Sequence, residues 1–208
     1  MIDILFENKD FVVCIKPVGI CSQSEKAEDM VKLLRAQTGS DIFPVHRLDT
    51  AVGGTMVFAK NSKTAALLSK QITDGTFKKK YLAVITGSPE EKSGVLKDLL
   101  FKDSSKNKTF VVRRERRGVK KASLEYETLM TAEGLSLVSI LLHTGRTHQI
   151  RVQFASRKMP LVGDSKYGSK DNRCSVALWS NEVSFTYNSD KMTFLSEPDK
   201  ATFPWNLF

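Results

Sequence analysis

Asp49 is the carboxylate whose neighbours suggest chemistry rather than packing. It follows Arg47 by two residues and precedes a loop of small residues with Gly53 and Gly54, and the apolar run Met56–Ala59 comes next. Such a run, bounded by turn residues, predicts a buried strand. The two glycines permit a positive φ or a close approach of a substrate to the backbone. The pattern fits a reactive carboxylate beside a cation, and it also fits a surface turn with an exposed ion pair.

A second group of polar side chains stands at the start of a predicted helix. Residues 142–155 read LHTGRTHQIRVQFA, and we expect the helix to begin near Thr147, whose hydroxyl could cap it. His148 and Arg151 are three residues apart and so would share a helical face. Arg146 lies at the entry, where free backbone N–H groups favour anions. Two cations and a histidine here suit recognition of a phosphate or carboxylate, and the alternative is an amphipathic helix with a solvated basic face.

Four motifs, taken together, resemble the RluA type of pseudouridine synthases. HRLD at residues 46–49, with the small-residue turn and a strand ending in Ala-Lys, is similar to the family's catalytic motif, and TGRTHQIR at 144–151 is similar to its later arginine motif. KKYLAV at 79–84 resembles its tyrosine strand, and NKDFVVCIKPVG at 8–19 resembles its first strand and Lys-Pro turn. The matches follow the family's order. One departure is that Val52-Gly53-Gly54 stands where the family usually has Thr-Ser-Gly, which removes two hydroxyls from the turn.

The resemblance implies a fold, an activity and a partner. The fold is α+β, with a mixed, mostly antiparallel central sheet flanked by helices and an active-site cleft. We expect residues 1–208 to form a single catalytic domain, without the small amino-terminal RNA-binding module that many relatives carry. The implied reaction turns specific uridines of structured ribosomal or transfer RNA into pseudouridine, and it needs neither cofactor nor metal. RNA is the expected partner, with no obligatory protein partner and a monomer as the default.

The resemblance also assigns roles to side chains. Asp49 acts on the ribose of a flipped-out uridine, either by attack at C1′ or by stabilising charge there and helping to deprotonate C2′. Arg151 is the cation that pairs with it, and Arg146 is a second choice. Tyr81 stacks on the uracil and could assist proton removal at C5; its alternative is a core aromatic. Arg47 fills the space that the flipped base leaves, and its alternative is an ion pair with Asp49.

Two histidines of these motifs are expected beside the substrate. We predict that His46 and His148 bind it and do not act as acid–base groups, because the reaction already has its carboxylate. The alternative for each is a hydrogen-bonded structural histidine. A hydrolase that uses one of them is a competing reading, which no nucleophile elbow or metal-ligand pair supports. A second competing reading is an RNA-binding or assembly protein that has lost turnover, for which the altered turn after HRLD is the argument.

The charge balance favours a polyanionic partner. Lys and Arg number 32 against 23 Asp and Glu, which gives a formal net charge of +9. We predict contacts with the RNA backbone from two clusters of cations, and such contacts weaken as salt rises. The alternative is a solvated basic hairpin. The residues of the two clusters are Lys79 and Lys80, and Arg113, Arg114, Arg116 and Arg117.

Composition and pattern exclude several classes and outline the elements. No apolar run approaches the roughly 20 residues that span a bilayer, and no cationic signal segment opens the chain, so we expect a cytoplasmic protein. Three widely spaced cysteines indicate neither disulfides nor a zinc cage. Strands outnumber helices without alternating with them, which also favours α+β. Among the expected elements are helices over residues 25–38 and 61–73, and a closing pair of strands over 176–179 and 183–187.

Overall fold

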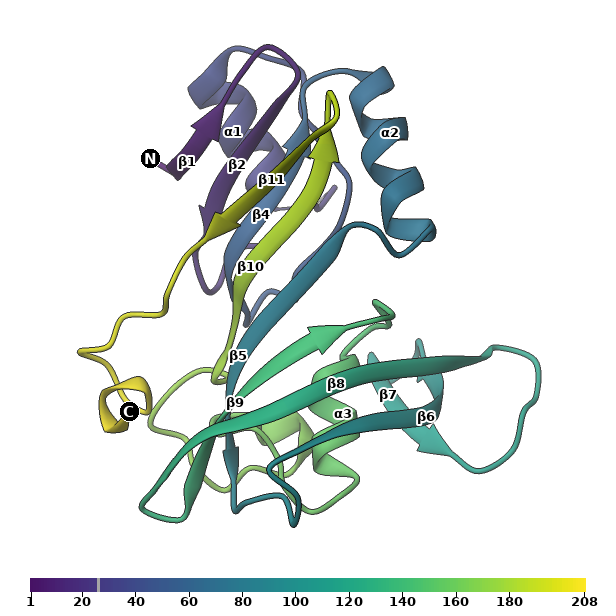
Figure 1. The fold of residues 1–208 in the computed structure, drawn as a ribbon, viewed down its shortest axis with the longest axis vertical. Coiled ribbons are helices and arrows are strands. Elements are labelled where there is room, and N and C mark those ends of the chain that lie inside the picture. The colour runs from purple at the N-terminus through teal and green to yellow at the C-terminus, as the bar shows by residue number, and fades with distance from the viewer. Residues whose placement is uncertain (26) are drawn as a thin grey trace. The chain divides into compact units, whose positions relative to one another are not determined.

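The computed structural model describes residues 1–25 and 27–208. The chain forms two compact units, drawn in Figure 1. Unit 1 holds Met1–Lys80 and Trp179–Pro198, and unit 2 holds Tyr81–Leu178 and Asp199–Phe208. The boundaries fall inside two strands, β5 (Lys78–Thr86) and β10 (Leu178–Tyr187), and after Pro198.

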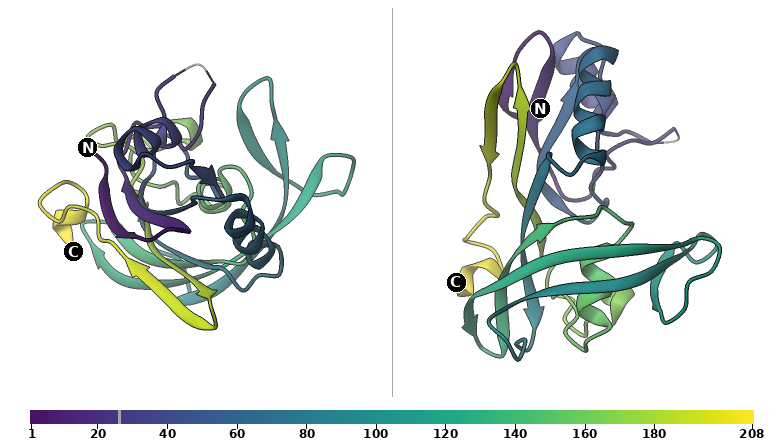
Figure 2. Two further views of the ribbon diagram at one scale, coloured as in Figure 1. Left: turned by 90° about the horizontal axis from the view of Figure 1, so that it is seen from above. Right: turned by 45° about the vertical axis from the view of Figure 1, so that its right-hand side comes forward.

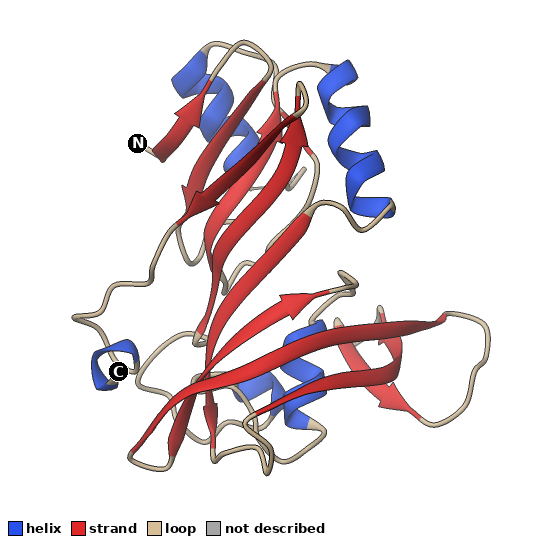
Figure 3. Ribbon diagram, viewed as in Figure 1, coloured by secondary structure: helices blue, strands red, loops and turns tan. Residues whose placement is uncertain are grey.

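Unit 1 is a sheet with two helices. Its other elements are β1 (Asp3–Glu7), β2 (Phe11–Lys16), α1 (Met30–Thr38), β3 (Phe43–Pro44), β4 (Gly53–Ala59), α2 (Ser62–Thr73) and β11 (Asp190–Leu195). The strand order is β1-β2-β4-β10, with β3 on β4 and β11 on β10. All these pairs are antiparallel except β4 with β10, which is parallel. Figure 3 shows the helices beside the strands.

Strand β4 is the centre of unit 1. All seven of its residues are buried, as the apolar run predicted. Val57 packs with Phe11 and Val13 of β2, and Leu68 of α2 joins the same cluster. Burying an aliphatic side chain of this size stabilises a fold by about 1.5–3 kcal/mol. The strand that follows the HRLD loop is therefore held on a rigid core.

The helices of unit 1 begin at capping side chains. The Asn61 side chain accepts from the Thr64 backbone N–H at 2.9 Å and starts α2, as predicted. Asp29 accepts from the Lys32 backbone N–H at 2.8 Å and starts α1. The expected start of this helix at residue 25 is therefore wrong, because the Asp29 cap begins it at Met30; Lys26 lies outside the described residues.

Unit 2 is a sheet with a short helix, and its pairs β6–β7, β6–β8 and β8–β9 are antiparallel. Besides β5 it contains β6 (Ser93–Asp103), β7 (Lys108–Val112), β8 (Val119–Ala132), β9 (Leu135–Leu142), α3 (Gln149–Ala155) and the 3₁₀ turns Ser165–Tyr167 and Trp205–Leu207. The strand order is β5-β9-β8-β6-β7. Val152 of α3 packs against Leu100 and Ala122 of the sheet. The right-hand view of Figure 2 shows β6 and β8 running together, with the loop between β7 and β8 at one end.

Two expectations about element boundaries are wrong. Helix α3 begins at Gln149, not near Thr147, because His148 takes a left-handed conformation with φ 52° and no side-chain cap is formed. His148 therefore does not share a helical face with Arg151. The expected closing pair over 176–179 and 183–187 is instead one strand, β10, whose antiparallel partner is β11.

The polar centre of β10 explains the second error. The segment Ser180-Asn181-Glu182 resembles a turn in the sequence, but each of its side chains has a partner. Ser180 Oγ donates to the Thr55 carbonyl at 2.9 Å, and Asn181 Nδ2 donates to the Ser196 carbonyl at 2.7 Å. Glu182 pairs with Lys80 at 3.2 Å. These contacts keep a polar segment inside a strand.

The fold class is the predicted one: α+β with a mostly antiparallel arrangement of strands and few helices. The three cysteines are free, as their spacing indicated. Among the helices that the structure describes, none has the length and apolar character needed to cross a bilayer.

Candidate active site

The loop that carries Asp49 is anchored on both sides. Before it, Leu48 is buried, and both its backbone groups bond to the Ser22 hydroxyl, at 2.9 Å and 2.8 Å. After it, the Thr50 carbonyl accepts from the Gly19 N–H at 2.8 Å. A turn bond of 2.9 Å from the Val52 N–H to the Asp49 carbonyl closes the loop. Asp49 is half-buried at the centre of this fixed backbone.

A buried lysine links the Lys-Pro turn to the same loop. Lys16 Nζ donates to the carbonyls of Pro17 at 2.8 Å and Ile20 at 2.7 Å, and to that of Thr50 at 3.4 Å. Burial lowers the pKa of Lys16 to about 8. The negative charge of Asp49 raises this pKa and so opposes the effect of burial. The Lys-Pro turn and the HRLD loop, which are far apart in the sequence, are therefore joined by hydrogen bonds next to Asp49.

The two glycines after HRLD are required by the chain's own packing. A Cβ on Gly53 would lie 2.5 Å from the Trp179 ring, and one on Gly54, whose φ is +118°, would lie 2.4 Å from the Ser180 carbonyl oxygen. The positive φ that such a loop permits is found at Gly54, and β10 makes a close approach to both glycines. Trp179 Nε1 donates to the Ser196 hydroxyl at 3.0 Å, which fixes the ring beside Gly53.

His46 is buried within unit 1. Its Nε2 accepts from the Val57 backbone N–H at 3.1 Å, and its ring lies 5.5 Å from that of Phe77. The neutral ring therefore carries its proton on Nδ1, which has no hydrogen-bond partner among the described residues. Burial, with a smaller effect of Lys79, lowers the pKa of His46 to about 3. This setting favours the structural alternative for His46, and its predicted contact with substrate stays a prediction.

The buried imidazole predicts an acid-sensitive fold. Between pH 6.5 and about 3 the unfolded chain binds a proton at residue 46 that the folded chain does not, so the free energy of unfolding falls as pH drops through this range. The slope is at most about 1.4 kcal/mol per pH unit for one proton. His46→Gln keeps an acceptor for the Val57 N–H, and we expect it to flatten this slope by about 1 kcal/mol per pH unit.

Urea unfolding at pH 6, 5 and 4 measures this slope. His143→Gln is the matched control, because it replaces a histidine that is exposed and paired with Glu125 at 2.9 Å. Equal slopes for wild type and His46→Gln would show that the acid sensitivity comes from other groups.

The remaining predicted residues of unit 1 are cations. Arg47 is exposed and, within the part of the chain that the structure describes, makes no ion pair, so the alternative pairing with Asp49 is not formed. Lys80 is half-buried and pairs with Glu182 at 3.2 Å. Burial lowers the pKa of Lys79. Of these three, Arg47 is the side chain best exposed to a partner.

In unit 2, Tyr81 and Arg151 are buried side chains on regular elements. Tyr81 is on β5 and 5% exposed, and Arg151 is on α3. Arg151 forms a bidentate pair with Asp164: Nε donates to Oδ2 at 2.7 Å and Nη2 donates to Oδ1 at 2.8 Å. The Arg151 guanidinium carbon lies 5.2 Å from the centre of the Tyr167 ring. Arg151 is therefore a cation whose position is set by two neighbours.

Arg146 and His148 stand at the entry to α3. Arg146 is exposed, and its Nε donates to the Lys121 carbonyl at 3.1 Å. His148 Nδ1 and the Tyr167 hydroxyl are 2.9 Å apart. Gln149 completes this entry, because its Oε1 accepts from the Arg146 backbone N–H at 3.0 Å. In unit 2, His148 and Arg151 thus meet at Tyr167.

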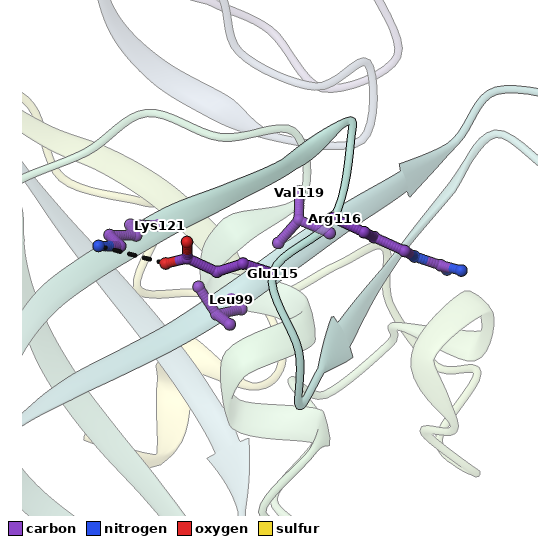
Figure 4. A pocket seen from close by; sticks show the side chains of 5 residues that line it. All are labelled: Leu99, Glu115, Arg116, Val119 and Lys121. Atoms are coloured by element: carbon purple, nitrogen blue, oxygen red, sulfur yellow. Dashed lines mark ion pairs between the residues drawn. The ribbon is translucent and has the colours of Figure 1, made fainter.

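The second predicted cluster of cations lies on the loop between β7 and β8, which we call the basic loop (residues 113–118). Its four arginines, Arg113, Arg114, Arg116 and Arg117, are exposed. Arg116 lies over the Phe101 ring at 4.7 Å. Figure 4 shows Arg116 extending away from Glu115 and Lys121, which pair at 3.2 Å beside an open pocket of about 360 Å³. The loop presents positive charge to solvent.

Sequence reasoning did not single out Lys16, Asp164 or Tyr167 as parts of a site. Lys16 stands in a matched motif, so its place in the Lys-Pro turn was a usable signal. Asp164 and Tyr167 lie outside the four matched motifs, and no spacing rule connects them to Arg151. No group of three or more metal-ligating side chains occurs among the residues described.

The comparisons with known proteins agree with the motifs. A family model described as RNA pseudouridylate synthase matches residues 10–156. The uncharacterized RNA pseudouridine synthase YhcT of Bacillus subtilis is 34% identical over 88% of this chain. The tRNA pseudouridine synthase C of Haemophilus ducreyi is 33% identical over 80%. Ribosomal large subunit pseudouridine synthase D of Borreliella burgdorferi is 33% identical over 82%. The aligned regions cover 63%, 74% and 56% of these three relatives.

Solved structures support the fold alone. Human RNA Pseudouridylate Synthase Domain Containing 1 superposes with a TM-score of 0.82 over 99% of this chain and 86% of that one, at 20% identity. Human RNA Pseudouridylate Synthase Domain Containing 4 gives 0.78 over 95% and 89%, at 21% identity. The family model covers the HRLD, tyrosine and arginine motifs completely, so the chain belongs to the RNA pseudouridylate synthase family, and its motifs are of the RluA type.

Proposed function

We propose that this protein isomerises specific uridines of structured RNA to pseudouridine. The observation that carries the proposal is the family match over residues 10–156, which includes Asp49, Tyr81 and Arg151. Two of the relatives are named for transfer RNA and for the large ribosomal subunit. We therefore propose an RNA of one of these two classes as the substrate.

Asp49 is the proposed catalytic carboxylate. The reaction breaks the C1′–N1 bond and joins C1′ to C5, so it needs a group that stabilises or captures positive character at the sugar. Glycosidases place carboxylates at the same carbon for this purpose. Asp49 stands on a backbone that Ser22, Gly19 and Lys16 fix by hydrogen bonds, and such support keeps a reacting group in position. In the proposed reaction, Asp49 either attacks C1′ or takes the proton from C2′.

Arg151 and Tyr81 are the proposed partners of Asp49 in the reaction. We assign Arg151 as the cation that pairs with the Asp49 carboxylate, as the resemblance implies. Tyr81 is assigned to stack on the everted uracil. Removing that base from its stack costs a few kcal/mol. Arg47 is exposed and stands two residues before Asp49, and we assign it to the space that the base leaves.

Release of tritium tests the proposed reaction. The C5 hydrogen of uridine is lost to water when C5 joins C1′, so RNA made with [5-³H]uridine reports each turnover. We expect release from transcripts of transfer RNA or of large-subunit ribosomal RNA. Pseudouridine maps of cellular RNA, with and without the protein, then identify the position. No release from either transcript class, together with unchanged maps, would overturn the proposal.

The basic loop predicts a salt-dependent affinity for RNA. Replacing its four arginines by Gln removes up to four phosphate contacts, and we expect weaker binding and a slope of log K against log salt that is smaller by about 3. The matched control replaces four exposed cations on α1 and α2 by Gln: Lys32, Arg35, Lys63 and Lys70. Filter binding at several salt concentrations measures both slopes. A slope equal to that of the control would mean that the basic loop is only solvated surface.

A further inference from the structure

The bidentate pair of Arg151 and Asp164 lies inside unit 2. The side chains are 7% and 1% exposed. Asp164 contacts the Nε–Nη2 edge of the guanidinium, which is one edge of a planar group with five donors. A carboxylate bound in this way fixes both the position and the plane of the guanidinium. The edge of the Arg151 guanidinium that does not contact Asp164 therefore has a fixed orientation.

The backbone under Asp164 is itself fixed. A Cβ on the preceding Gly163, whose φ is +78°, would lie 2.2 Å from the Ser175 carbonyl oxygen, so the chain is in close contact there. One residue earlier, the Val162 N–H donates to the Val84 carbonyl of β5 at 2.9 Å. The Asp164 carbonyl accepts from the Tyr167 N–H at 3.0 Å. Asp164 is therefore a rigid support for a long side chain.

Tyr167 supplies the second contact. Its ring lies under the guanidinium, at 5.2 Å from ring centre to the Arg151 carbon, a cation–π distance. Its hydroxyl accepts from the Thr109 backbone N–H of β7 at 2.8 Å and is 2.9 Å from His148 Nδ1. Lys108 lies 5.1 Å from the same ring. The ring is thus tied both to the entry of α3 and to the strand that leads into the basic loop.

We infer that Asp164 and Tyr167 are positioning residues, which hold the Arg151 guanidinium in the orientation that the reaction requires. The inference rests on the proposed function, because Arg151 is assigned there as the partner of Asp49. Helix α3 has only seven residues and begins without a side-chain cap. The helix alone does not set the direction of a flexible arginine side chain. The ion pair with Asp164 and the contact with the Tyr167 ring set it.

Asp164→Asn and a matched control test the inference. The amide keeps the shape of Asp164, but one of its two oxygens is replaced by a donor that faces another donor. The control is Asp98→Asn, which weakens a pair of the same kind just beyond α3: Arg157 Nη1 to Asp98 at 2.9 Å. Thermal melts first establish that both variants are folded. Single-turnover tritium release at saturating protein then gives the rate constant, and titration gives RNA affinity.

We expect Asp164→Asn to lower the rate constant about 100-fold, as a small misplacement of a reacting group does, with RNA affinity unchanged. Asp98→Asn should match the wild type. Tyr167→Phe, which keeps the ring and loses the hydroxyl bonds, should show a smaller loss of rate. In an Arg151→Met background, Asp164→Asn should cause no further loss, because it acts through Arg151.

The contrary outcomes separate the inference from the proposed function. A wild type that turns over while Asp164→Asn is as fast as Asp98→Asn would overturn the inference alone. A further 100-fold loss from Asp164→Asn in the Arg151→Met background would also overturn it, because the effect would not pass through Arg151. A wild type that releases no tritium from either RNA class would overturn the proposed function, and the inference with it.

Discussion

Asp49→Asn is expected to lower the rate of tritium release by about 10⁴-fold or more, a loss typical of a group that reacts directly. Asparagine has nearly the shape of aspartate, so the loop should keep the backbone bonds made by Leu48, Thr50 and Val52. It can neither attack C1′ nor take a proton from C2′. RNA affinity should be retained, since the exposed arginines of the basic loop are unchanged.

The measurement for Asp49→Asn is single-turnover tritium release together with filter binding. Asp41→Asn is the matched control, because this exposed acid of the same unit forms only a weak surface pair with Arg35 at 3.6 Å. Turnover by Asp49→Asn at the rate of the control would remove Asp49 from the reaction. If Asp49→Asn lost RNA binding as well as turnover, the result would instead indicate a change in the structure of the loop.

Arg151→Met is expected to lower both activity and stability. Asp164, at 1% exposure, would lose its bidentate partner, and an uncompensated buried charge costs about 3–5 kcal/mol of unfolding free energy. Activity should fall because the site would lose the cation that we propose as the partner of Asp49.

A second substitution separates the two effects. Arg151→Met with Asp164→Asn removes both charges, so we expect it to recover much of the lost stability without recovering activity. Urea unfolding measures the first quantity and tritium release, well below each melting temperature, the second. Normal turnover by the folded double variant would move the ion-pair role from Arg151 to another cation, with Arg146 as the next candidate.

Local signals predicted the elements whose cause is local. The pattern of residues 61–73 predicted α2, and the apolar run Met56–Ala59 predicted the buried strand β4. The α+β class followed from the excess of strands. The motif residues, identified by resemblance, lie on the elements expected to carry them: Asp49 before a buried strand, Tyr81 on a strand and Arg151 on a helix.

What could not be predicted depends on tertiary contacts. His148 takes a positive φ beside Tyr167, and this moved the start of α3. The polar centre of β10 stays in a strand because partners distant in sequence, such as Thr55 and Ser196, accept its hydrogen bonds. Asp164 pairs with Arg151 across 13 residues of loop and helix end. In each case the deciding partner is far away along the chain, where no periodicity or propensity can indicate it.

The contact between Gly53 and Trp179 limits which residues can stand together at these two positions. A serine at position 53, the usual residue in the family that the motifs resemble, would need a smaller or displaced side chain at position 179, because its Cβ would lie 2.5 Å from the Trp179 ring. Either substitution alone would pass through a disfavoured intermediate. We therefore expect the residues at positions 53 and 179 to covary among related sequences.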